Sequence, residues 1–397
     1  MFVELHVIQN HSPSNLNRDD TGSPKHATFG GFRRARISSQ CIKRSIRRSH
    51  IFRQELEEHL GMRTRRLPEL VRSALKEQGC ADDIAEVAAK KASGFGTAEG
   101  KERPVSEDGT YATAQTMFLT DHDVNAVVEV MKKAAQEKGS AEAMNKVPAK
   151  ELQTLSDLKG YRPITVDIAL FGRMITSEAF RDADASCQVA HAISTHKVAQ
   201  EFDYFTAVDD LKDLDETEAD AGADMIGDVE FNSACYYKYF SIDFDGLVAN
   251  LTGESAHRKD ITDRDRNEAR ELAARTVQTF LKSAVLTTPT GKQNTFAAHQ
   301  LPAMVFVEVR PCKIPVNYAN AFVEPAKATA KTDLVSDSLD KFARHMAAMS
   351  KCFNLQADLR LILAPEHPEL VLDGVSAERV QDFESLCARL RSVMLDG

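Results

Sequence analysis

Residues 231–243 read FNSACYYKYFSID, a run rich in aromatic residues whose alternation predicts a β-strand. The helical pattern of residues 263–283 follows this strand, and AMVFVEV at 303–309 predicts another strand after the helix. The three elements together predict a β-α-β unit in the second half of the chain.

The first half of the chain supplies a matching set of elements. FVELHVIQ at 2–9 predicts a strand, and either Ser38 or Ser39 can cap a helix that runs to about Phe52. PITVDIALF at 163–171 predicts a buried strand. The complete order is then β-α-β-β-α-β, the ferredoxin-like order that RNA recognition motifs use. We therefore expect an α+β fold with an RRM-like (ferredoxin-like, βαββαβ) domain.

Two long insertions interrupt this order. The expected RRM-like domain comprises residues 1–53, 161–171 and 231–397. A helical insertion is expected at 54–160 and a second, more polar insertion at 172–230. The alternative is two separate α+β domains divided near residue 160.

The composition of the 397 residues is that of a globular protein, with 43% hydrophobic and 27% charged residues. No apolar run approaches the roughly 18 residues of a membrane helix, and the N-terminus lacks the basic start of a signal peptide. The seven cysteines are too far apart for CxxC zinc or redox motifs. We expect a cytoplasmic, reduced protein that binds no metal and no cofactor.

The net charge of −9 hides a marked segregation of charge. Residues 25–53 contain nine Lys or Arg and no Asp or Glu, whereas residues 201–230 contain twelve acids and one Lys. The basic stretch has no interspersed acids to pair with, and Gly30-Gly31 leaves backbone N–H groups open to a phosphate. Nucleic-acid binding is therefore the first hypothesis, and a solvated basic helix face is its alternative.

Four blocks of sequence resemble, in order, a known family. They are SPSNLNRDDTGSPKHATFGGFRRARISSQCIKRSIRRS (12–49), VDIALFGRMITSE (166–178), AHAISTHKV with FDYFTAVDDL (190–211), and GKQNTFAA (291–298). They are similar to the CasC family, the repeated backbone subunit of the type I-E CRISPR Cascade complex. The resemblance is dense in the first block and at 163–211, and weak across 54–150 and after about 325.

The resemblance implies a hand-shaped subunit with an RRM-like palm, helical fingers from the insertion at 54–160, and a thumb hairpin from that at 172–230. Such subunits assemble head to tail as a helical filament along CRISPR RNA (crRNA), kink it at regular intervals and present it to a target DNA strand. The implied partners are crRNA, target DNA, other copies of the chain, and Cascade subunits of the CasA, CasB, CasD and CasE types, with no membrane. The implied role is non-enzymatic.

The guide sequence is arbitrary, so its binding has to involve phosphate and ribose. By family analogy, contacts to the RNA backbone are assigned to Lys25, Ser38, Gln40, Lys43 and Arg47. Weaker candidates are Arg18, Arg33, Arg34, Arg36, Arg44, Lys292 and Gln293. Gln40, Lys43 and Arg47 lie on one stripe of the expected helix, because their spacings are three and four residues.

The resemblance also implies a thumb contact. Met174 matches the family's methionine beside the kinked nucleotide, and Tyr204, Phe205 and Thr206 match the thumb tip, where an aromatic ring can replace lost base stacking. The acidic stretch 208–230 would repel a phosphate backbone, so we expect it to point away from the guide.

Two other functions remain open from the sequence. Related backbone subunits of type III complexes cleave bound RNA through a thumb aspartate, and Asp209 or Asp210 would be the candidate here. An unrelated acidic enzyme with a ferredoxin-like core and a phosphate substrate is the third possibility, although no catalytic constellation in the sequence supports it.

Overall fold

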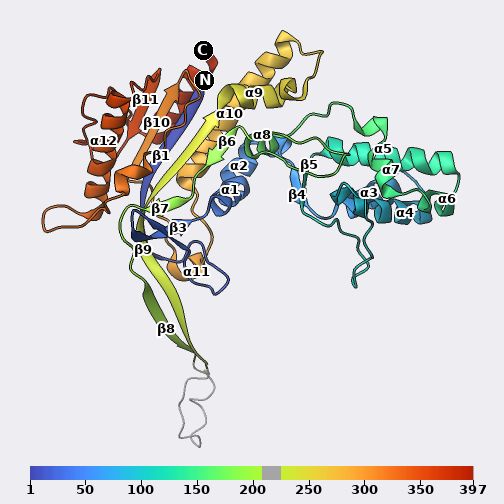
Figure 1. Cartoon of the computed structure of the whole chain (residues 1–397), viewed down its shortest axis with the longest axis horizontal. Coiled ribbons are helices and arrows are strands. Elements are labelled where there is room, and N and C mark those ends of the chain that lie inside the picture. The colour runs from blue at the N-terminus through green and yellow to red at the C-terminus, as the bar shows by residue number, and fades with distance from the viewer. Residues whose placement is uncertain (208–224, 397) are drawn as a thin grey trace, which may run out of the picture. The chain divides into compact units, whose positions relative to one another are not determined.

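The computed structural model describes residues 1–207 and 225–396, and these form two compact units (Figure 1). Unit 1 comprises residues 1–52, 188–242 and 277–397, and unit 2 comprises residues 53–187 and 243–276. The segments of the two units interleave along the chain, so neither unit is a continuous half divided near residue 160. The α+β class expected from the sequence is confirmed.

Unit 1 is built on a large sheet with the strand order β12-β11-β10-β1-β9-β7-β3-β2. Its strands are β1 (Phe2–Ser14), β2 (His26–Phe29), β3 (Phe32–Ile37), β7 (Ala192–Ser194), β9 (Met225–Asp243), β10 (Met304–Arg310), β11 (Leu359–Leu363) and β12 (Glu378–Arg379). β1 and β10 are antiparallel, with a register that runs from Phe2 opposite Arg310 to Ile8 opposite Met304. β6 (Cys187–Val189) and β8 (Glu201–Ala207) also pair with β9.

Three of the four expected strands are confirmed, because residues 2–9, 231–243 and 303–309 lie in β1, β9 and β10. The strand expected at 163–171 is wrong: Val166–Phe171 is helix α8. Val166, Ile168, Ala169 and Leu170 are all buried, and a short, fully buried apolar run does not distinguish a strand from a helix. The place beside β9 belongs instead to β6 and β7, in a stretch whose sequence looks irregular.

Each face of the unit 1 sheet is covered by helices. On one face, α12 (Leu334–Cys352) packs Phe342 against Phe306 and Tyr318. On the other face, the ring of Phe240 meets Phe280 of α10 (Asp263–Leu286) edge-on, at a centroid distance of 5.6 Å. The other helices of unit 1 are α1 (Ser39–Arg48), α11 (Gln293–Phe296) and α13 (Phe383–Asp396), with the 3-10 turn η6 (Tyr318–Phe322). α2 (His50–Glu55) follows α1 across the boundary between the units.

Unit 2 is mainly helical, as the sequence of residues 54–160 predicts. Its helices are α3 (Leu67–Glu77), α4 (Asp82–Ala92), α5 (Asp121–Lys138), α6 (Ala141–Asn145), α7 (Ala149–Gln153), α8 and α9 (Phe244–Thr252), and the start of α10 belongs to it. β4 (Met62–Thr64) and β5 (Met117–Leu119) form a short antiparallel ribbon. The buried carboxylate of Asp123 pairs with Arg162 at 2.9 Å and with Arg173 at 2.6 Å.

A hairpin formed by β8 and the first half of β9 extends from the unit 1 sheet (Figure 1). Its register runs from Glu201 opposite Phe231 to Ala207 opposite Met225. Residues 208–224 lie outside the described residues, as do the candidate nuclease residues Asp209 and Asp210 and most of the acidic stretch 208–230. Within the described part of the chain, none of the helices is long and apolar enough to cross a membrane.

Candidate nucleic-acid interface

The predicted binding segment, residues 25–53, contains helix α1, and its N-terminus is held by hydrogen bonds from other segments. Of the two serines that the sequence offers as caps, Ser38 is the N-cap, and its Oγ accepts the Cys41 N–H at 3.3 Å. The Ser38 N–H donates to Asn17 Oδ1 at 2.8 Å, and the Ser39 N–H donates to His191 Nδ1 at 3.1 Å. A loop and a strand end therefore hold this helix start in place. The first turn of α1 contains no acidic residue, so the helix dipole favours an anion here.

Two basic residues from other segments, Lys25 and Arg36, lie near His191 at this helix start. The backbone of Lys25 is fixed by its N–H bond to Asn17 O at 2.8 Å, and Arg36 N donates to Lys25 O at 2.9 Å. Partial burial lowers the pKa of His191, and the nearby charges of Arg36 and Lys25 lower it further. Arg36 Nε is buried and has no hydrogen-bond partner among the described residues. Among the described residues, neither Lys25 nor Arg36 forms an ion pair with a carboxylate.

The outer faces of α1 present the predicted polar stripe. Ile42 and Ile46 are buried, with 6% and 1% exposure, and they fix the orientation of the helix. Gln40 and Arg44 are exposed, and Lys43 and Arg47 are half-buried. The helix thus displays amide, ammonium and guanidinium donors, a set that suits phosphate and ribose oxygens. Contact of these residues and of Ser38 with RNA stays a prediction.

Arg34 behaves differently from the other arginines of the basic stretch. Its side chain is fully buried, and its guanidinium donates to the carbonyl oxygens of Phe29, Ser194, Thr195, Phe322 and Val323. These bonds join the β2–β3 hairpin to β7 and η6. The weaker assignment of Arg34 to RNA is corrected on this ground, because its donors face protein carbonyls and not the surface.

Of four other weaker candidates, two have local hydrogen-bond partners. Arg33 donates to Gln200 and to His26, so it is tied to the base of the β8–β9 hairpin. Gln293 holds its own loop, since its Oε1 accepts the Ala298 N–H at 2.7 Å and its Nε2 donates to Pro289 O at 3.1 Å. Arg18 is exposed. Lys292, next to Gln293, has a left-handed backbone with φ 50°.

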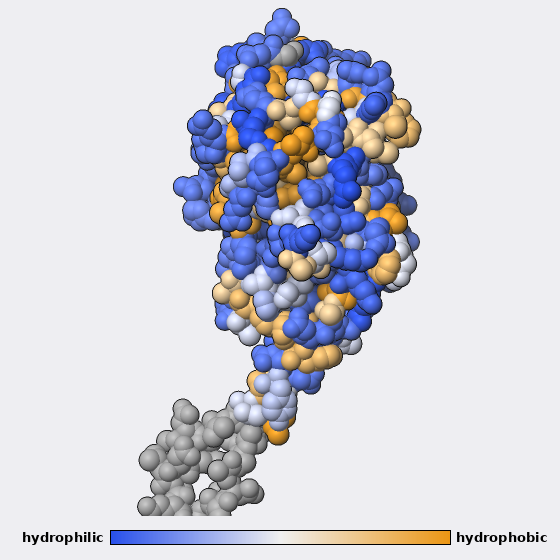
Figure 2. Space-filling view, turned by 90° about the vertical axis from the view of Figure 1, so that its left-hand side faces the viewer, coloured by the Kyte–Doolittle hydropathy of each residue, from blue (hydrophilic) through white to orange (hydrophobic). Residues whose placement is uncertain are grey.

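The described end of the β8–β9 hairpin carries exposed apolar side chains (Figure 2). Tyr204 is 65% exposed and lies on the same face as Thr206, because side chains alternate along a strand. Phe205 lies on the opposite face over Gly227, where a Cβ would come within 2.5 Å of its ring. The glycine therefore lets this ring lie flat across the hairpin. The aromatic pair predicted from the sequence is thus divided between two faces, and Tyr204 is the more accessible of the two.

Hydrogen bonds and packing connect the base of the β8–β9 hairpin to the loop after β1 and to the α11 loop. Asn15 Nδ2 donates at 2.9 Å to both Gly22 O and Glu230 O. The rings of Phe231 and Phe296 lie 5.5 Å apart, and Gly291 packs against the backbone at Leu16. Asn15, Asn17 and His191 thus position this surface, yet the sequence did not assign any of them to it. Their only signal is that they lie in the blocks 12–49 and 190–211, which resemble the family.

Met174 belongs to unit 2 and is 91% exposed. The residue before it, Arg173, is buried and held by Asp123 and by Phe118 O at 3.2 Å. Ile175 N donates to Asp182 Oδ1 at 2.7 Å on the other side. Both neighbours are anchored, so the methionine is presented to solvent on a fixed backbone. Its proposed contact with a nucleotide stays a prediction.

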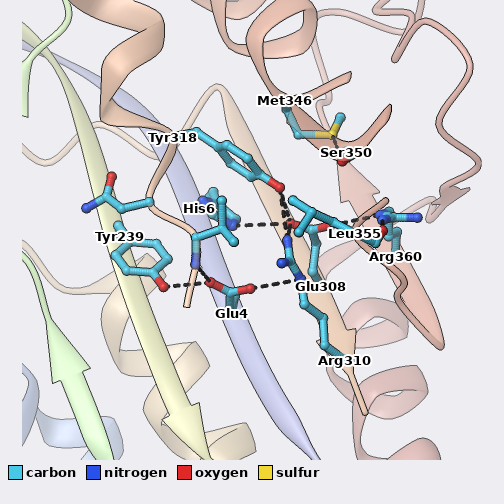
Figure 3. Close-up of polar contacts among 12 residues, drawn as sticks. Glu4, His6, Tyr239, Glu308, Arg310, Tyr318, Met346, Ser350, Leu355 and Arg360 are labelled. Carbon is cyan, nitrogen blue, oxygen red and sulfur yellow. Dashed lines mark hydrogen bonds and ion pairs between the residues drawn. The ribbon is translucent and has the colours of Figure 1, made fainter. Parts of the chain in front are cut away.

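A second group of charges lies inside unit 1, on the α12 side of the sheet (Figure 3). Glu308 is completely buried, and its carboxylate binds Arg310 at 2.8 Å, Arg360 at 2.8 Å and the Tyr318 hydroxyl at 2.9 Å. Burial alone would raise the pKa of Glu308, but His6 and the two arginines hold it well below its usual range. This group is matched internally and offers no free charge to a ligand.

Comparisons with known proteins agree with this arrangement. A protein-family model described as CT1975-like protein matches residues 3–388. A solved chain of a "CRISPR RNA-guided surveillance complex, pre-nicking" is 25% identical with a TM-score of 0.79, and the match covers 99% of this chain and 100% of that one. A chain of a "CRISPR RNA-guided surveillance complex" is 21% identical with a TM-score of 0.70 and the same coverage. No curated protein matches. The resemblance identified from the sequence is confirmed.

Proposed function

The chain belongs to the CT1975-like protein family, and from this we propose that it is a non-enzymatic backbone subunit of a Cascade-type CRISPR surveillance complex. In this proposal, copies of the chain assemble head to tail along crRNA and hold its phosphate–ribose backbone without reading its bases. The guide is kinked at intervals, and the segments between kinks remain open for pairing with a target DNA strand. The complex works in the cytoplasm with subunits of the CasA, CasB, CasD and CasE types.

One observation carries this proposal: donors and positive charge gather at the start of α1, where Lys25 and Arg36 form no ion pair within residues 1–207 and 225–396. Lys25 and Arg36 lie at the uncompensated helix start, and Gln40, Lys43 and Arg47 continue the donors along one stripe. Arginine, lysine and glutamine bind phosphate and ribose oxygens and can also bind base edges, so the choice of the backbone rests on the arbitrary sequence of the guide. Sequence-independent binding of a backbone is the function that such a surface serves best.

The strand order supports an RRM-like palm. β10, β1 and β9 are adjacent, and β7 takes the place of the second strand of the βαββαβ order. Unit 2 would supply the fingers, and the β8–β9 hairpin would supply the thumb. Tyr204 of the thumb would stack where the guide is kinked, and Met174 would contact a base face, since neither side chain demands a base-specific hydrogen bond.

Co-expression with a CRISPR array and its neighbouring genes tests the proposal. The tagged protein should retain small RNAs of uniform length that carry array repeats. Lys43→Gln with Arg47→Gln should lower the RNA recovered per mole of protein. The control Arg264→Gln with Arg266→Gln removes two exposed, paired cations and should not lower it. Recovery of no RNA with the unsubstituted protein would contradict the proposed function.

A further inference from the structure

The described part of the β8–β9 hairpin contains acidic residues and no basic residue. The acids are Glu201 and Asp203 of β8 and Asp228 and Glu230 of β9. None of them forms an ion pair within residues 1–207 and 225–396. Unpaired carboxylates repel a phosphate chain, so RNA binding alone does not explain the charge of this hairpin. A partner with positive charge does.

The two faces of this hairpin differ in their side chains. Residues opposite each other in an antiparallel pair share a face, and side chains alternate along each strand. Asp228 lies opposite Tyr204, so these two residues share a face with Phe202 and Ile226, whereas Asp203 lies on the other face. Phe202, Tyr204 and Ile226 are 64%, 65% and 62% exposed. One face of the hairpin is therefore both acidic and apolar, and such an exposed patch is typical of a docking surface.

Unit 1 also presents a surface of the opposite charge, at the start of α1. Lys25 and Arg36 form no ion pair within the described ranges, so the two oppositely charged sets do not meet within one copy. β9 is one uninterrupted strand from Met225 to Asp243, and the hairpin extends outward from the sheet without folding back on α1 (Figure 1). A second copy of the chain supplies the complementary basic surface.

We propose that, in the absence of RNA, the acidic and apolar face of the hairpin binds the basic surface at the start of α1 in a second copy of the chain. The Asp228 carboxylate takes the place of a phosphate, and the Tyr204 ring lies against a basic side chain. The identity of the competitor rests on the proposed function, in which RNA binds the same basic surface. Unlike a filament that RNA holds together, this contact is lost when RNA binds.

Sedimentation equilibrium of the full-length protein, purified free of nucleic acid, tests the hairpin side of this contact. Self-association should occur at low salt and weaken as salt is added, because salt screens exposed charges. Asp228→Lys should lower the association constant by about tenfold, since it replaces an attraction with a repulsion. The control Asp203→Lys makes the same change of charge on the other face and should leave the association constant unchanged. Both aspartates are exposed, so both variants should fold.

The same measurement tests the basic side of the contact. Lys25→Gln with Arg36→Gln should also weaken self-association. The control Arg264→Gln with Arg266→Gln removes the same charge from paired arginines of unit 2 and should not weaken it. An RNA of scrambled sequence that is too short to hold two copies should convert the associated protein into monomers, because it competes for the same surface.

The outcomes separate this contact from the proposed function. A monomer at low salt, or equal effects of Asp228→Lys and Asp203→Lys, would overturn the contact. Association that persists in Lys25→Gln with Arg36→Gln, or in the presence of the short RNA, would place the hairpin on another surface and would also overturn it. In either case, RNA binding that Lys43→Gln with Arg47→Gln weakens would leave the proposed function intact. No RNA binding by the unsubstituted protein would contradict the proposed function and, with it, RNA as the competitor.

Discussion

The two charged regions of unit 1 differ in whether their basic side chains form ion pairs. On the α12 side of the sheet, the buried Arg310 pairs with Glu4 and Glu308, and the partly buried Arg360 pairs with Glu308, so each charge faces one of opposite sign. At the start of α1, Lys25 and Arg36 form no ion pair with a carboxylate of the described residues. The difference lies in ion pairing and not in the amount of positive charge. Basic side chains that pair with carboxylates form a structural cluster, whereas those without such pairs can bind an anion.

The largest change in stability is expected when Glu308 loses its charge, because its carboxylate pairs with two arginines. Glu308→Gln leaves the partly buried Arg360 beside a neutral group and leaves the buried Arg310 with Glu4 alone, so we expect a loss of about 3–5 kcal/mol in the free energy of unfolding. Denaturant unfolding measures it. Glu378→Gln removes an exposed partner of Arg389 and should cost under about 1 kcal/mol. Equal losses for the two variants would contradict the account of the buried cluster.

The next prediction concerns the pH dependence of stability, which arises from the buried His11. His11 is buried beside Lys238, and burial lowers the pKa of its imidazole to about 4, with the charge of Lys238 adding to the effect. Between pH 6.5 and 4 the unfolded chain therefore binds a proton that the folded chain does not. Stability should fall as the pH drops through this range, by about 3 kcal/mol in total.

Unfolding curves of His11→Asn and of the unsubstituted protein across this pH range check the assignment. The substitution should remove the contribution of His11 to the slope of unfolding free energy against pH, and the contributions of the other groups should remain. The same slope in both proteins would show that His11 is not the group that titrates.

Arg34 provides a smaller test within the basic stretch itself. Arg34→Lys cannot bond to five carbonyl oxygens in the same geometry, so we expect a loss of about 2 kcal/mol in stability. Arg36→Lys should change stability by less than about 0.5 kcal/mol. Thermal unfolding separates the two variants, and a reversed order would contradict the division of the stretch into structural and binding residues.

The smallest effect concerns the start of α1. Ser38→Ala removes the oxygen that accepts the Cys41 N–H, so stability should fall by about 1 kcal/mol. Ser38→Asp keeps an acceptor at the N-cap and should retain most of the stability, but its negative charge should weaken RNA binding. If Ser38→Asp bound RNA as tightly as the unsubstituted protein, the helix start would not contact a phosphate.

Sequence reasoning reached most of the fold, because β1, β9, β10 and α10 carry long patterns of clear periodicity. It failed at α8, where six residues are too few to show a helical period. It also grouped Arg34 with Arg33 and Arg36, since charge along the chain does not reveal which side chain the fold buries. Asn17 and His191 could not be predicted from local patterns, because they act on α1 from distant segments.

The most direct test of the central claim is the affinity of the unsubstituted protein for two RNAs of equal length and unrelated sequence, titrated with salt. Binding through the charged residues Lys25, Lys43 and Arg47 predicts equal affinities and a log–log slope near −2 per subunit, from roughly −0.7 per charge. Affinities that differ strongly between the two RNAs, or a slope near zero, would contradict the claim that this surface holds a phosphate–ribose backbone.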